Sequence, residues 1–316
     1  MTNLRDLKEE LSKPRRKGAP SRTEERRLVA LARSGDVTAT RRLLERLSPP
    51  IYRFGRGFCR NTEDAEDVMQ EVLTSLVRSL PTLRGDASLT TWAYTVARNA
   101  CIRQRRREGR RTVSLDGPAD GGSAGHAPLE IVDPRHDPER ELERQELGSA
   151  LREALLALPA THRETLILRD IEGLPSGEVA RILHVRERAV KSRLHRARAA
   201  MRDALAPHIA AEVPARGPGC PDVAHLLSRY IEGELDASRC ASLAAHVRSC
   251  GHCGAACRAL RRSLGVCRRF GTRPLPPPAR EALRRALRAV IAELRWSGPL
   301  RRVSGAGPAG RIRPKA

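Results

Sequence analysis

Three cysteines and one histidine in the last third of the chain have the spacing of a metal site. They form the pattern Cys-x25-His-x3-Cys-x2-Cys with Cys220, His246, Cys250 and Cys253. A histidine and a cysteine four residues apart share one face of a helix, and the Cys-x2-Cys step adds a second thiolate at the helix end. With the distant Cys220 they make four protein ligands, which predicts a closed, structural Zn²⁺ site.

A further cysteine leaves the ligand set open. Cys257 follows Cys253 by four residues and could replace one of the four ligands. We expect Cys240 and Cys267 to be thiols outside the site. No pair of acid and base residues accompanies the cluster, and a catalytic zinc would keep one position for water. We therefore expect that the chain is not an enzyme, and metal removal with an activity screen would test the alternative of a zinc-dependent enzyme.

A strongly basic stretch carries a second kind of chemistry. The apolar spacing predicts a short helix over 177–183, a tight turn, and a longer helix over 187–204. Cationic and small polar side chains share the exposed face of the longer helix: Arg188, Lys191, Ser192, Arg193, Arg196 and Arg198. Contact with base edges and phosphates requires such a mixture, so the pattern predicts a DNA-reading helix-turn-helix. The alternative is a basic helix that faces only solvent.

The net charge agrees with a polyanionic partner. Lys and Arg total 59 against 37 Asp and Glu, a formal charge of +22, and such an excess is typical of nucleic-acid-binding proteins. Aromatic residues make up only 3% of the chain, which disfavours single-strand binding on rows of stacking rings. The sequence has neither an apolar run of bilayer length nor an apolar N-terminal signal core. We expect a cytoplasmic protein without a membrane partner, whose eight cysteines are thiols or metal ligands.

The elements that must position these groups are all helical. Apolar residues recur at intervals of three and four, without the alternation typical of a strand. The clearest helices are expected over 64–80, 89–107, 141–157, 160–171, 177–183 and 187–204. The predicted fold class is all-α, with two small helical domains and a small helical zinc-binding module.

One of these helices has an unusual exposed side. Acidic and amide side chains gather there on an otherwise basic protein: Asp64, Asp67, Gln70 and Glu71. Acids in a first turn also complement the helix dipole. The cluster alone therefore allows either a local role or a docking role.

Together these motifs resemble those of the extracytoplasmic-function (ECF) sigma factors of bacterial RNA polymerase. The run Val-Lys-Ser-Arg-Leu-His-Arg-Ala-Arg over 190–198 resembles region 4 of that family, and the segments 64–72 and 89–100 resemble region 2. The cysteine-rich segment resembles a zinc-binding anti-sigma domain. One helix-turn-helix alone would suit many repressors, whereas region 2, a linker and region 4 in this order are typical of a sigma factor.

The resemblance implies that core RNA polymerase and promoter DNA are partners. It places the polymerase contacts on the acidic side of the 64–80 helix, at Asp64, Asp67, Gln70 and Glu71. It places contacts with the −35 element on the basic helix, at Arg188, Lys191, Ser192, Arg193, Arg196 and Arg198. It places contacts with the −10 element in the first block, at Arg84, Asp86, Ser88, Arg98, Asn99 and Arg103. Two residues depart from the family pattern, because His184 replaces a glycine and Ala189 replaces a threonine.

The resemblance also implies a domain organisation. The expected order is a disordered basic arm (1–21), region 2 (22–107), a linker (108–138), region 4 (139–206), a linker (207–219), an anti-sigma-like zinc finger (220–270) and a basic tail with one amphipathic helix (271–316). We expect the zinc module to contact the sigma regions within the chain and to regulate them. The alternatives are a helix-turn-helix regulator that does not act through the polymerase core, and an inactive sigma remnant that serves as a scaffold or inhibitor.

Overall fold

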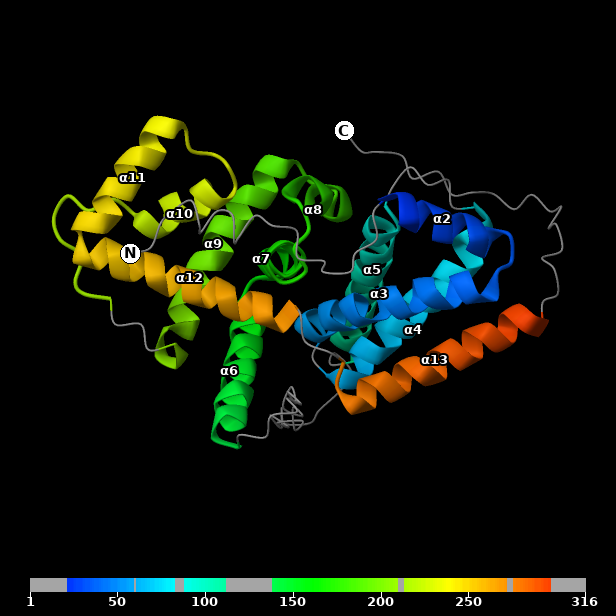
Figure 1. Ribbon diagram of the computed structural model, residues 1–316. Helices are drawn as coiled ribbons and strands as arrows, with labels where there is room; N and C mark the ends of the chain where they lie inside the picture. Colours follow the sequence, from blue (N-terminus) through cyan, green and yellow to red (C-terminus); the bar gives the residue numbers. More distant parts are fainter. Residues whose placement is uncertain are drawn as a thin grey trace.

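The computed structural model of the chain describes residues 22–59, 61–82, 88–111, 138–209, 213–271 and 275–296. Every regular element in these ranges is a helix or a helical turn, which confirms the predicted all-α class (Figure 1). The predicted disordered arm over 1–21, nearly all of the 108–138 linker and the end of the basic tail lie outside the described residues.

The first domain is a bundle built around three long helices. Its elements are α2 (Arg22–Arg33), α3 (Val37–Phe58), α4 (Thr62–Ser79), the 3₁₀ turn η1 (Leu80–Thr82) and α5 (Leu89–Arg111). Side-chain caps fix where two of them begin. The backbone N–H of Thr38 donates to Asp36 at 2.7 Å, and that of Asp64 donates to Asn61 at 2.7 Å. The apolar stripes of the long helices meet in a core that includes Leu44, Phe54, Val72 and Ala97.

The second domain contains the predicted helix-turn-helix. Its elements are α6 (Pro138–Ala157), α7 (Ala160–Leu166), the π-helical turn η2 (Ile167–Ile171), α8 (Ser176–Leu183), α9 (Glu187–Leu205) and η3 (Ala206–His208). The helix predicted over 160–171 is thus α7 followed by a π-helical turn. The turn before α9 passes through His184 with φ 54° and ψ 45°, a left-handed conformation that favours glycine. The tight turn is nevertheless retained with histidine at this position.

The third unit is the cysteine-rich module. It consists of α10 (Val223–Ile231), α11 (Ala237–Ser249) and α12 (Gly251–Gly271). The inner faces of these helices form a small separate core with Val223, Leu227, Tyr230, Leu243 and Leu260. The end of α12 extends beyond this core, and its Val266 and Phe270 pack into the core of the larger domains. The approach is close, because a Cβ at Gly271 would overlap the backbone oxygen of Ile171 in η2.

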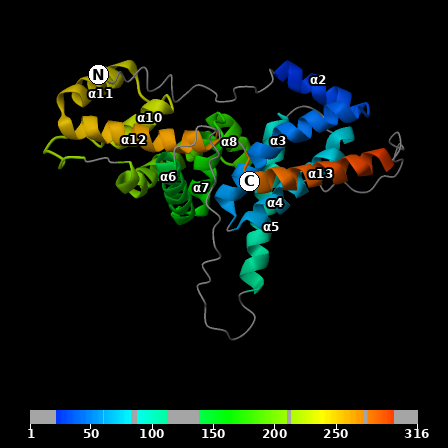
Figure 2. The ribbon, with the colours of Figure 1, turned by 60° about the horizontal axis from the view of Figure 1, so that its bottom comes forward.

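The last described helix returns to the first domain. α13 (Pro277–Trp296) lies along α3 and α4 in both ribbon views (Figures 1 and 2). Its buried side chains are mostly small: Ala279, Ala282, Ala286, Leu287 and Ile291. The sequence predicts this amphipathic helix over 280–296, and its position across the first domain is a finding of the structure.

The first and second domains pack directly against each other. Their buried apolar residues form one continuous core, to which α13 and the end of α12 also contribute. A Cβ at Gly57 in α3 would lie 2.8 Å from Cδ1 of Ile167 in η2. The two domains are therefore in close contact across this face and do not behave as separate bodies in this conformation.

Candidate metal centre and nucleic-acid interface

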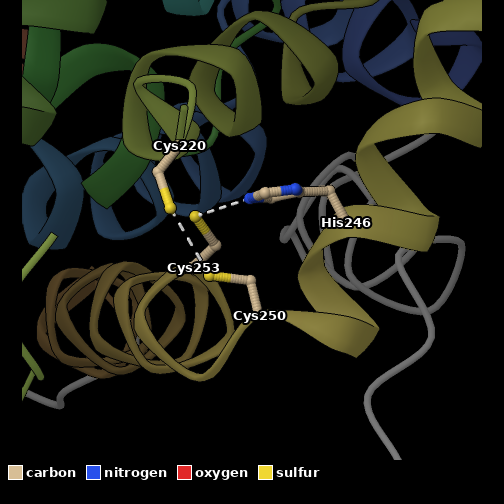
Figure 3. Close-up of side chains that lie close together, drawn as sticks. All are labelled: Cys220, His246, Cys250 and Cys253. Atoms are coloured by element: carbon tan, nitrogen blue, oxygen red, sulfur yellow. Dashed lines mark hydrogen bonds between the residues drawn. The ribbon is translucent and has the colours of Figure 1, made fainter. Parts of the chain in front are cut away.

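The four predicted metal ligands come together where α11 meets α12 (Figure 3). His246 lies in the last turn of α11, Cys250 caps that helix, and Cys253 lies in the first turn of α12. Cys220 comes from the segment before α10, and its Sγ lies 3.5 Å from Sγ of Cys250. Nε2 of His246 lies 3.1 Å from Sγ of Cys253. All four ligand atoms lie within 4.8 Å of one another.

This arrangement fits a zinc ion held by protein ligands alone. Bond lengths of about 2.3 Å to sulfur and about 2.0 Å to nitrogen place the ligand atoms of a tetrahedral site roughly 3.5–3.8 Å apart. Burial and the thiols of Cys250 and Cys220 raise the pKa of Cys253 to about 12. A cation at the centre would favour the thiolate form that the Cys253 thiol otherwise resists. Four protein ligands would leave no position for water, as in a structural site.

The remaining cysteines of the segment lie outside this cluster. Cys257 is buried in the small core of the module, and Cys267 is buried in the larger core. Cys240 is half-buried near the backbone oxygen of Leu235. Within the described ranges, the only group of histidine, cysteine and acidic side chains that converges as metal ligands do is the predicted set. Cys257 therefore does not replace a ligand in this conformation.

An acidic turn after α10 attaches the module to the second domain. Glu232 accepts a hydrogen bond from Ser176 at 2.6 Å and pairs with Arg198 at 2.7 Å and with Arg169 at 3.3 Å. Arg198 also pairs with Asp170 at 2.7 Å. Burial opposes ionisation of Glu232, but the two arginines and the Ser176 hydroxyl outweigh it and lower its pKa to about 2. Removing one member of this network would leave an uncompensated buried charge.

A histidine provides a second contact between α9 and the module. Nδ1 of His195 lies 2.8 Å from the hydroxyl of Ser228, and Nε2 lies 3.0 Å from Glu234. The imidazole also meets the ring of His225 edge-on, with the ring centres 4.9 Å apart. Burial lowers the pKa of His195 although Glu234 acts in the opposite direction. The contact therefore favours the neutral imidazole.

Three of the predicted −35 contacts form an exposed stripe on α9. Arg188, Ser192 and Arg196 are spaced by four residues and are all exposed, so they share one face of the helix. Lys191 is partly buried, and its Nζ lies 3.5 Å from Glu187. The cysteine-rich module packs on another side of α9 and leaves this stripe uncovered.

Arg198 does not belong to this stripe, which corrects the expectation that its side chain lies on the exposed face of the helix. Its side chain is only 1% exposed, and its guanidinium is enclosed by Asp170 and Glu232. The expectation treated Arg198 as part of the exposed basic face. However, Arg198 follows the buried Leu194 by four residues, and therefore lies on the inner face of α9.

The predicted −10 contacts lie in different environments around α5. Ser88 precedes the helix, and its hydroxyl accepts a hydrogen bond from the backbone N–H of Thr91 at 3.1 Å, as a capping residue does. Asn99 is exposed, and Arg103 forms an ion pair on the surface with a carboxylate of α4. Arg84 and Asp86 lie outside the described residues.

Arg98, another predicted −10 contact, faces the second domain together with two neighbours. Its Nε donates to Glu164 at 2.8 Å. The hydroxyl of Tyr94 donates to Glu172 at 2.8 Å, and Arg53 donates to the same carboxylate from two nitrogens at 3.0 and 3.1 Å. In this conformation these groups hold the two domains together.

The acidic side of α4 is divided between two neighbours. Asp64 and Glu71 bond to side chains of α5. Asp67 and Gln70 line a groove of about 370 Å³ between α4 and α13. Burial also raises the pKa of Glu66, which borders the same groove. Two of the predicted polymerase contacts, Asp67 and Gln70, thus lie beside α13 and are exposed in this groove.

Sequence reasoning missed the carboxylates that hold the units together: Glu164, Glu172, Glu232 and Glu234. Two of them had a recognisable signal. Glu172 and Glu232 end η2 and α10, and each is followed by a glycine with positive φ. An acid at a helix C-terminus is opposed by the helix dipole. Its presence there indicates a cationic partner from elsewhere in the chain.

Family models match three parts of the chain. The model "Sigma-70 region 2" matches residues 43–111, "Sigma-70, region 4" matches 149–201, and "Putative zinc-finger" matches 220–254. The RNA polymerase sigma-H factor of Pseudomonas aeruginosa is 30% identical over 187 residues, which cover 58% of this chain and 95% of that protein. The ECF RNA polymerase sigma factor SigM of Mycobacterium tuberculosis is 32% identical over 172 residues, which cover 54% of this chain and 80% of that protein. The chain belongs to the ECF sigma factors.

The family matches fall on the units that the structure defines. Region 2 of this sigma factor includes α4 and α5, region 4 includes the helix-turn-helix of α8 and α9, and the zinc-finger match ends within α12. α13 lies beyond all three matches. The sigma factor RpoE of Bartonella quintana, solved in complex with the anti-sigma factor NepR, aligns with a TM-score of 0.42 and 22% identity over 52% of this chain and 94% of that one. None of the described helices combines the length and apolar character that a bilayer span requires.

Proposed function

We propose that this sigma factor binds core RNA polymerase and directs it to promoters, and that the conformation described above is its closed, inactive form. The initiation function is supported by a region 2 and a region 4 in one chain, each with charged side chains suited to its partner. The observation that carries the closed form is the position of α13 across α4.

The docking face for polymerase is the first target of this inhibition. We assign polymerase contacts to Asp64, Asp67, Gln70 and Glu71 of α4, and two of these border the groove against α13. Ala282 and Ala286 of α13 are buried against the first domain. Because two macromolecular surfaces cannot occupy the same face of α4, docked α13 excludes polymerase.

The zinc module anchors this covering helix. α12 begins at the metal cluster and ends against η2 of region 4, and α13 begins six residues later. We propose that Zn²⁺ is structural, holding α10, α11 and α12 in one unit through Cys220, His246, Cys250 and Cys253. The protein then has no enzymatic role, and the metal acts on transcription by fixing the position of α13.

A run-off transcription assay with core polymerase on genomic promoter fragments tests both parts of the proposal. Glu in place of Ala286 would lie against the acidic α4 and displace α13, whereas Ala292 is exposed on the same helix and provides the matched control. We expect more transcript from Ala286→Glu than from the unaltered chain or from Ala292→Glu. Equal transcript from all three would contradict the closed form. No transcript from these chains, nor from a chain that stops at residue 213, would contradict the initiation function.

The alternative function is a helix-turn-helix regulator that does not act through the polymerase core. Replacing Lys191 and Arg196 with Ala in the Ala286→Glu background separates the two. A sigma factor would lose promoter-specific transcripts and still bind core polymerase in a pull-down assay. A plain regulator would lose DNA binding and show no polymerase binding with or without these changes.

A further inference from the structure

Regions 2 and 4 touch each other through two carboxylates that lie among cationic side chains. We propose that Glu164 and Glu172 form an internal clasp in which carboxylates take the places of nucleic-acid phosphates, so that closure of the chain and DNA binding compete for the same arginines. The inference rests on the proposed function, because it takes Arg98 and Arg193 as DNA-binding residues.

Glu164 is shared between the two DNA-binding regions. Its side chain is 4% exposed and lies on α7, between α5 of region 2 and α9 of region 4. Arg98 of α5 donates to it at 2.8 Å, and Arg193 of α9 approaches to 3.9 Å. One carboxylate therefore neutralises a candidate −10 contact and a candidate −35 contact at the same time.

Glu172 is the second carboxylate at the contact between regions 2 and 4. It is enclosed by Arg53 at 3.0 Å and by the hydroxyl of Tyr94 at 2.8 Å, and only 3% of its side chain is exposed. It ends η2, where the helix dipole disfavours a negative charge. The partners that favour this buried carboxylate come from region 2, so the charge is satisfied only while the two regions are together.

Close packing between the two regions completes the clasp. A Cβ at Gly57 would lie 2.8 Å from Ile167 across the contact. The guanidinium of Arg163 also lies over the ring of Phe58, with 6.0 Å between the guanidinium carbon and the ring centre. Arg98 is 20% exposed while it is paired with Glu164, so a DNA phosphate can replace that carboxylate only after this face has opened.

The clasp differs from the contacts made by the zinc module. The side chains described above belong to regions 2 and 4, and none comes from the module or from α13. Removing the module alone would therefore leave this closure in place. Carboxylate and phosphate oxygens accept the same paired hydrogen bonds from a guanidinium group, which makes DNA a direct competitor for Arg98 and Arg193.

The test measures binding of a short DNA duplex to the full-length, zinc-loaded chain by fluorescence anisotropy at fixed salt. Glu164→Gln removes the shared charge, and Glu153→Gln removes an exposed charge from α6 as its control. Gly57→Ala adds a methyl group to the contact without altering any charge. Its control is Gly265→Ala, where the nearest atom to an added Cβ is the end of a flexible arginine at 3.6 Å.

We expect Glu164→Gln to raise the apparent affinity about tenfold and Gly57→Ala to raise it severalfold, because DNA binding is weakened by the fraction of closed chains. Each control should change it less than about twofold. In a chain that also carries Arg98→Gln and Arg193→Gln, Glu164→Gln should have no more effect than Glu153→Gln. Equal gains from Glu164→Gln and Glu153→Gln would mean general electrostatics and would overturn the clasp.

Small-angle X-ray scattering supplies a readout that does not depend on DNA. The radius of gyration should increase for Glu164→Gln and for Gly57→Ala, and not for the two controls. An unchanged radius in both variants would overturn the clasp. Expansion without DNA binding by any chain would instead contradict the proposed function and the competition with DNA. If Glu164→Gln does not fold, Gly57→Ala decides the question, because alanine favours the helix that contains this position.

Discussion

The zinc module contacts region 4 and the helix that follows it contacts region 2, and the two contacts rely on different kinds of interaction. On region 4 the module docks through buried charges, with Glu232 bonded to Arg198 and Arg169. On region 2, α13 docks through apolar side chains, among them Ala282, Ala286, Leu287 and Ile291, and a groove of about 370 Å³ remains beside them. The first contact adds a buried, geometrically specific ion-pair network to the apolar packing of Val266 and Phe270, whereas the second is mainly apolar and leaves a groove unfilled.

This difference assigns different roles to the two contacts. A buried ion-pair network loses most of its stability when one member is removed, so it acts as an all-or-none anchor. Each buried methyl or methylene group contributes only about 0.8 kcal/mol, so an apolar contact without buried ion pairs can be weakened in small steps. We therefore expect α13 to leave region 2 before the module leaves region 4. Opening at α4 is the step that exposes the polymerase face.

Loss of zinc should break both contacts and has the largest expected effect. Replacing Cys250 and Cys253 with Ser leaves two of the four ligands. Apparent zinc-binding free energies of small zinc domains are about 10–16 kcal/mol, and that energy is also folding energy. We expect less than one zinc per chain and rapid hydrogen exchange throughout 220–267. Cys240→Ser is the control, and retention of one zinc per chain by the double variant would show that the ligand set is wrong.

Removal of Glu232 should release the module from region 4 with the metal still bound. Glu232→Ala leaves Arg198 buried with Asp170 alone, and breaking a buried pair on one side costs about 3–5 kcal/mol. The free energy of unfolding in denaturant, measured with saturating zinc, should fall by this amount. Glu45→Ala on the exposed side of α3 is the control. A loss no greater than that of the control would mean that the anchor lies elsewhere.

Acid should weaken the same contact through His195. The expected loss of unfolding free energy is smaller than that caused by Glu232→Ala. Burial holds the pKa of His195 below its ordinary value of 6.5, and the facing groups are Ser228, Glu234, His225 and Arg198. The docked form keeps the imidazole neutral, so its stabilising contribution is complete above pH 6.5 and is lost as the pH falls through the lowered pKa. His195→Gln should flatten the pH dependence of the unfolding free energy between about pH 7.5 and 5.5. Identical slopes for the two chains would refute this coupling.

The fold and the metal cluster could be predicted from local spacing. Helical periodicity gave the helices, and the Cys-His-Cys-Cys spacing predicted the four side chains that converge. Both are short-range properties, since His246, Cys250 and Cys253 are placed by one helix end. The assignment of individual residues to polymerase, −10 and −35 contacts stays a prediction.

The contacts between the units could not be predicted in the same way. Arg98 and Glu164 lie 66 residues apart, and nothing in either local pattern selects the other as a partner. The charge pattern of α9 predicts a uniformly exposed basic face, whereas Arg198 lies on the inner face, where Asp170 of region 4 and Glu232 of the module bind its guanidinium. A charge pattern predicts which face of a helix is mostly exposed. A carboxylate from elsewhere in the chain can still bury a single arginine of that face.

The smallest expected effect comes from filling the groove beside α13. Ala289 lines that groove together with Gln70 and Asp67, so Ala289→Met should place new apolar surface there and stabilise the docked helix by about 1 kcal/mol. Hydrogen exchange of the α13 amides should slow severalfold, and run-off transcription should decrease. Ala292→Met, exposed on the same helix, should change neither. Faster exchange in Ala289→Met would mean that the groove is already closed in solution and has no room for the larger side chain. α13 would then be held as tightly as the module, and there would be no reason to expect region 2 to open first.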